Sequence, residues 1–71
     1  MTDTAIALLR ALENTRTAQR AVECACDPIY PDAHLMDLSR DLGWTSRKLA
    51  HMAEQYGAGT AAIERVELMG A

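Results

Sequence analysis

The stretch that decides the fold is "LSRDLGWTSRKLAHM", residues 38–52. Its apolar residues recur at helical spacing, and Gly43 stands between two helix-like runs. Glycine adopts a left-handed backbone without steric penalty, so it often follows the last residue of a helix. We therefore predict that one helix ends at Leu42, that the chain turns at Gly43, and that a second helix begins at Thr45, whose hydroxyl can cap it.

The segments on either side predict further helices. The run from residue 2 to residue 25 has an apolar stripe at helical spacing, and the two prolines of "CDPIYP", residues 26–31, end it. Around the glycine, helices are expected over residues 31–43 and 44–57. Residues 60–71 are rich in alanine and glutamate, which favours a fourth, short helix. The alternative for this last segment is a strand, the wing of a winged helix.

These elements make one small all-α domain. We expect three to four helices in a single domain, residues 1–71, built around a helix-turn-helix corner. A chain of this length buries only about 60% of its unfolded surface, so its core is small. In the 26–31 connection, Ile29 and Tyr30 are expected to anchor the chain to that core.

The charge argues against a simple nucleic-acid binder. The chain has seven basic and ten acidic residues, a net charge of −3. Small nucleic-acid binders are usually basic, because their affinity comes largely from neutralising phosphates. The balance is more favourable over residues 39–54, where three basic residues stand against two acidic ones. The central stretch is therefore mildly positive on a negative body.

No pattern points to catalysis or to a metal. Cys24 and Cys26 are too close in sequence to staple the fold and are expected to be reduced thiols. His34 and His51 do not complete a zinc-binding spacing. We expect no enzyme activity, no cofactor and no metal. No signal peptide or membrane-spanning run is recognised, so a cytoplasmic protein without membrane association is expected.

Residues 35–54 resemble the helix-turn-helix motif of bacterial and phage DNA-binding proteins. In that motif a glycine in the turn is flanked by apolar residues at fixed offsets. The residues five and one before Gly43, and one, six and nine after it, are all apolar: Leu38, Leu42, Trp44, Leu49 and Met52. Ser39 departs from the pattern, since the motif usually has alanine there. The resemblance covers about 20 residues and identifies no single family.

The resemblance implies binding to double-stranded DNA. In such motifs the start of the second helix enters the major groove. Ser46 and Arg47 would then contact base edges. Thr45 and Lys48 would hold phosphate, helped by free amides at the helix start. His51 would reach a base or phosphate one turn further on, and Arg40 the flanking backbone.

Two functions are expected to compete. The first is a small DNA-binding protein, a transcriptional regulator or recombination accessory factor of phage or bacterial type. Specificity would then need a homodimer, with its seam expected in the C-terminal segment, or a partner protein. The alternative is an acidic helical module that binds and modulates a host or partner protein without contacting DNA.

Overall fold

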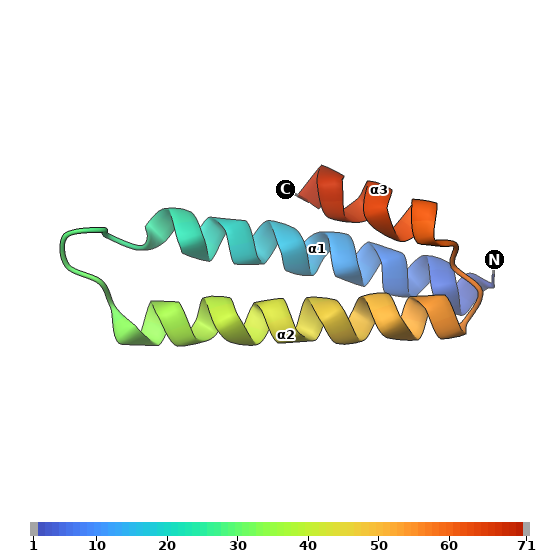
Figure 1. Ribbon diagram of the computed structural model, residues 1–71, viewed down its shortest axis with the longest axis horizontal. Helices are drawn as coiled ribbons and strands as arrows, with labels where there is room; N and C mark the ends of the chain where they lie inside the picture. The colour runs from blue at the N-terminus through green and yellow to red at the C-terminus, as the bar shows by residue number, and fades with distance from the viewer. Residues whose placement is uncertain (1, 71) are drawn as a thin grey trace.

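The computed structural model describes residues 2–70, and for residues 69 and 70 only the backbone. Three α-helices make up the fold: α1 (Asp3–Ala25), α2 (Ala33–Gln55) and α3 (Thr60–Gly70). The all-α prediction is confirmed. The strand alternative is wrong, because residues 60–70 are helical. α1 and α2 form an antiparallel hairpin in a molecule 44 Å long, and α3 packs against α1 at the end of the hairpin nearest the N-terminus (Figure 1).

The turn expected at Gly43 is wrong. α2 runs without a break from Ala33 to Gln55, through Gly43 and Trp44. A glycine inside a helix costs only about 1 kcal/mol relative to alanine, and good helix formers surround this one. Gly43 also faces α1: a β-carbon there would lie 3.2 Å from Nε2 of Gln19. This glycine permits close approach of two helices and does not turn the chain.

Replacing Gly43 by alanine tests the continuous helix. We expect Gly43→Ala to raise the free energy of unfolding by up to about 1 kcal/mol, because alanine favours helix and the Gln19 side-chain amide can move aside. The same change combined with Gln19→Ala removes the close contact and should give the full gain. Both are measured by denaturant unfolding followed by circular dichroism. A clear loss of stability in both variants would indicate that Gly43 needs a backbone that alanine cannot adopt.

The helix ends follow local signals in the sequence. The Thr2 hydroxyl caps α1 by accepting a hydrogen bond from the amide of Ala5, and it donates one to the carbonyl of Tyr56. The Asp32 carboxylate caps α2. At the other end of α2, Gly57 has a φ of 100°, the left-handed backbone that glycine favours. The predicted end of this helix at Gly57 is therefore confirmed.

The hydrophobic core occupies one end of the hairpin. The buried apolar residues come from α1, from the end of α2, from the connection that follows it and from α3: Ala5, Leu9, Leu12, Ala53, Ala58 and Ile63. Among the described residues, none between 13 and 45 is a buried apolar residue. The half of the hairpin farther from α3 is therefore held by two helices alone.

The connection between α1 and α2 projects from that far end. The Asp27 carboxylate accepts hydrogen bonds from the amides of Ile29 and Tyr30, which orders the turn. The side chains of Ile29 and Tyr30 are 75% and 79% exposed. The expectation that they anchor the connection to the core is wrong, because α3 lies at the opposite end and leaves them nothing to pack against.

Candidate interaction surfaces

One side of α2 packs along α1 and uses small residues to do so. Ser46 is completely buried, and its hydroxyl donates a hydrogen bond to the carbonyl of Leu42 at 2.9 Å. Ser39 donates to the Glu23 carboxylate of α1 at 3.4 Å, and Ala53 is fully buried. These residues recur every seven positions. The expectation that Ser46 reads a base edge is wrong, because its side chain lies inside the hairpin.

The other predicted phosphate contacts also change with the continuous helix. The Thr45 hydroxyl donates to the carbonyl of Asp41. Residues two apart on a helix lie about 200° apart around its axis, so Thr45 and Arg47 face opposite sides. Because residues 45–48 lie in the middle of α2, their amides belong to the helix's own hydrogen bonds. The free amides expected to hold phosphate near Thr45 and Lys48 are therefore absent.

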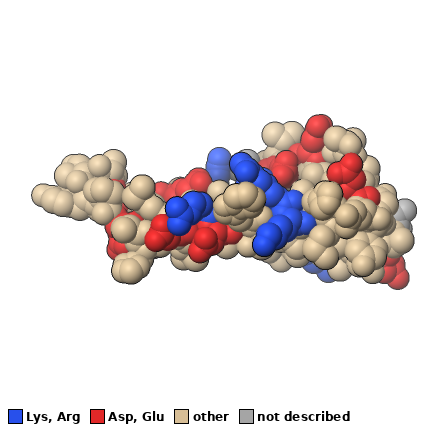
Figure 2. All heavy atoms as spheres, turned by 60° about the horizontal axis from the view of Figure 1, so that its bottom comes forward, with Lys and Arg blue, Asp and Glu red and all other residues tan. Residues whose placement is uncertain are grey.

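Four of the predicted DNA-binding residues do share one exposed side of α2: Arg40, Arg47, Lys48 and His51. They surround Trp44, which is 58% exposed. The Arg47 guanidinium lies 5.6 Å from the centre of the Trp44 ring, a cation–π contact. We call these five residues the basic face. Figure 2 shows the Lys and Arg side chains gathered around the middle of the molecule, with acidic side chains on both sides of them.

A groove between α1 and α2 extends the basic face. It is lined by three arginines, a glutamine, a glycine and a tryptophan: Arg16, Arg40, Arg47, Gln19, Gly43 and Trp44. Arg16 is held in place by Gln19 and by an ion pair with Glu67 of α3, each at 3.0 Å. Arg40 pairs with Asp37 at 2.9 Å. Two of the three guanidinium groups therefore already have a carboxylate partner.

The opposite side of the hairpin carries no charge. Arg16 reaches α3 and shares its groove with Arg47, so α3 lies on the Arg47 side of the hairpin. Helical spacing places a set of uncharged residues on the side away from α3: Thr4, Ala7, Leu8, Ala11, Thr15, Ala18 and Val22 of α1, with Leu35, Leu38, Leu42, Thr45, Leu49 and Met52 of α2 and Tyr56 at its end. We call this the uncharged face.

The uncharged face exposes large apolar side chains. Leu38, Met52 and Tyr56 are 46%, 43% and 47% exposed. We did not predict this surface from the sequence, yet a signal for it is present. Uncharged residues recur at alternating intervals of three and four from Leu35 through Tyr56, without interruption at Gly43. The turn expected at Gly43 divided this pattern between two helices, so its continuity was not recognised.

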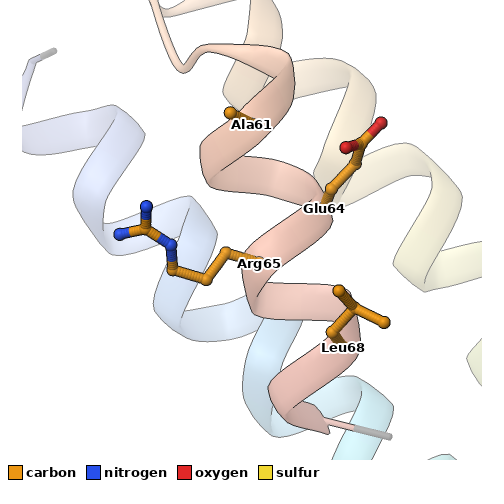
Figure 3. A pocket seen from close by; sticks show the side chains of 4 residues that line it. All are labelled: Ala61, Glu64, Arg65 and Leu68. Atoms are coloured by element: carbon orange, nitrogen blue, oxygen red, sulfur yellow. The ribbon is translucent and has the colours of Figure 1, made fainter.

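The other surface features of the described residues do not form a site. A shallow hollow on the outer side of α3 is lined by Ala61, Glu64, Arg65 and Leu68. Figure 3 shows the Glu64 and Arg65 side chains pointing to opposite sides of the helix, so their charges do not converge. Within residues 2–70, histidine, cysteine and carboxylate side chains form no cluster suited to a metal ion. None of the described helices combines the length and apolarity needed to cross a bilayer.

No model of a known protein family matches the chain, and neither does any of the curated proteins or solved structures compared with it.

Proposed function

We propose that the chain is a protein-interaction module whose uncharged face binds a helical surface of a partner. The observation that carries the proposal is the set of half-exposed apolar side chains, Leu38, Met52 and Tyr56, along one side of α2 and at its C-terminal end. A contiguous exposed apolar surface is typical of a binding site. Alternating spacings of three and four are the pattern by which one helix packs along another.

The positions of the charged residues and of the buried apolar residues support the same proposal. The charged residues of α1 and α2 all lie outside the uncharged face. The hairpin's far half has no buried apolar residue between positions 13 and 45. Small domains commonly obtain missing core from a partner chain. A helix laid along the uncharged face would supply it.

Capture on immobilised protein tests the proposal. We expect binding partners of the wild type to be lost with Leu38→Lys plus Met52→Lys, because two charges would enter the buried contact. The matched control is Arg40→Ala plus Arg47→Ala, which alters only the basic face and should retain the partners. The wild type should also retain its partners after nuclease treatment. Partners that bind the lysine variant as well as they bind the wild type would contradict the proposal.

Double-stranded DNA is the second candidate, and the basic face favours it. Arg40, Arg47, Lys48 and His51 project from one side of α2 around an exposed tryptophan. Cationic side chains along one helix face can neutralise phosphates. The net charge of −3 and the ion pair of Arg40 with Asp37 weigh against it. This candidate therefore stands second to protein binding.

Salt dependence of DNA binding tests the second candidate. Contact with about three phosphates should give a log–log slope of affinity against salt near −3. Labelled duplex is titrated with the wild type and with Arg40→Ala plus Arg47→Ala, and the variant should bind with a shallower slope of about −1. The same slope for both proteins, or no binding by the wild type at low salt, would reject the basic face as a DNA-binding surface.

A further inference from the structure

We propose that the partner of the uncharged face is a second copy of this chain, with the two α2 helices packed antiparallel to form a four-helix bundle. This inference rests on the proposed function, because it names the occupant of the same face. A two-fold axis passes between residues 43 and 44 of the two α2 helices. Each α2 then lies against the other α2, and each α1 against the other α1.

The spacing along α2 fits this symmetry. Residues at alternating intervals of three and four occupy the contact positions of a helix pair: Leu35, Leu38, Leu42, Thr45, Leu49 and Met52. With the axis between residues 43 and 44, Leu35 lies level with Met52 of the second copy. Leu38 likewise meets Leu49, and Leu42 meets Thr45. A single two-fold axis generates each layer twice, so the surface is complementary to itself.

The charged residues beside the contact positions of α2 favour an antiparallel arrangement of the two α2 helices. On one edge, Ser39, Ser46 and Ala53 are covered by α1. On the open edge, where these contact positions border the basic face, the charged residues are Asp41 and Lys48, seven positions apart. In the antiparallel register Asp41 lies beside Lys48 of the second copy, and Lys48 beside its Asp41. In a parallel pair each residue is level with its own counterpart, so neither charge finds an opposite one at its level.

The rest of the hairpin leaves room for the second copy. On α1 the residues of the uncharged face nearest the axis are Thr15, Ala18 and Val22, which are small enough to let the two α1 helices approach closely. Gln19 contacts Gly43, so the axis passes near the middle of the hairpin, next to the half that lacks a core. α3 lies on the other side. We place the seam here and not in the C-terminal segment, where α3 already buries Ile63.

The available area is enough for a dimer. About 18 residues of α2 extend about 27 Å, and α1 lies opposite its counterpart over about 13 residues, or about 20 Å. With each helix about 10 Å wide, the shared face amounts to about 500 Å² per copy, or about 1,000 Å² in total, which is the size that a specific interface needs. We therefore expect a dimer at micromolar concentration.

Charge reversal tests the partner and the register together. Wild type should sediment as a dimer. Asp41→Lys and Lys48→Asp should each weaken dimerisation by about tenfold, because each places like charges at both symmetric pairs. The double variant restores opposite charges and should recover the wild-type affinity. Mixing the two single variants should produce heterodimers in preference to either homodimer. Arg47→Glu, on the basic face, is the matched control and should leave dimerisation unchanged.

A gain of affinity gives an independent readout. Thr45→Leu turns both Leu42–Thr45 layers into leucine pairs and should tighten the dimer at least tenfold, as sedimentation equilibrium would show. Circular dichroism confirms that each variant remains helical.

A wild type that stays monomeric at high micromolar concentration overturns the inference. If the capture experiment then still shows partners lost by the lysine variant, the proposed function stands with another occupant. If it does not, both fail. A dimer unaffected by the charge reversals and by Thr45→Leu overturns the antiparallel register.

Discussion

Leu12→Ala is expected to lower the free energy of unfolding by about 3 kcal/mol, which is most of the stability of a domain this small. Leu12 is the largest apolar side chain that is completely buried, and it lies in the core cluster with Leu9 and Ile63. Removing its three terminal carbons leaves a cavity in the core cluster that the three helices share. The few surrounding core residues cannot close that cavity without losing contacts of their own.

Denaturant unfolding followed by circular dichroism measures this loss. All variants are compared at one protein concentration, because association would add to apparent stability. Leu68→Ala is the control: Leu68 is 76% exposed on α3, so its truncation should change stability by less than about 0.5 kcal/mol. If Leu12→Ala and the wild type had equal unfolding midpoints, Leu12 would not be part of the hydrophobic core.

Ser46→Leu is expected to destabilise the hairpin by about 1–3 kcal/mol, because it forces a larger side chain between packed helices. Ser46 is completely buried on the α1 side of α2. Ser46→Ala should have little effect, since it keeps the small volume and leaves the Leu42 carbonyl its bond within the helix.

The same pair of variants distinguishes a Ser46 that is buried in the hairpin from a Ser46 that contacts base edges on a DNA-binding helix. A serine that contacts base edges is exposed in the free protein, so leucine at position 46 would leave stability unchanged and alter only DNA binding. Thermal unfolding of both variants distinguishes the two cases. A wild-type melting temperature for Ser46→Leu would show that the residue is not packed against α1.

Much of the fold could be predicted because its signals are local. Thr2 caps α1, the prolines of residues 26–31 end that stretch of helix, and Gly57 adopts the left-handed backbone that ends α2. Each of these signals acts through one residue and its immediate neighbours. The helical composition of residues 60–70 acts in the same way.

The meaning of Gly43 could not be predicted from its neighbours. A glycine among helix formers suits the end of a helix, and it equally suits a point where another helix passes close by. The contact with Gln19 shows that Gly43 lies where another helix passes close by. Trp44 changes role with it, from an apolar residue flanking the expected turn to an exposed ring beside Arg47. Of the residues expected to contact DNA, Ser46 is buried and Thr45 lies on the opposite side from Arg47.

By itself, the sequence determined that the chain is helical, where α1 begins and where α2 ends, because capping residues, prolines and a left-handed glycine act over a few residues. Only the tertiary structure decided that residues 33–55 are one helix and which of its sides remains open. The physical reason is that α1 covers one strip of α2 and α3 occupies the Arg47 side of the hairpin. The strip from Leu38 to Tyr56 is left partly exposed, and no local pattern could show which of several apolar strips that would be.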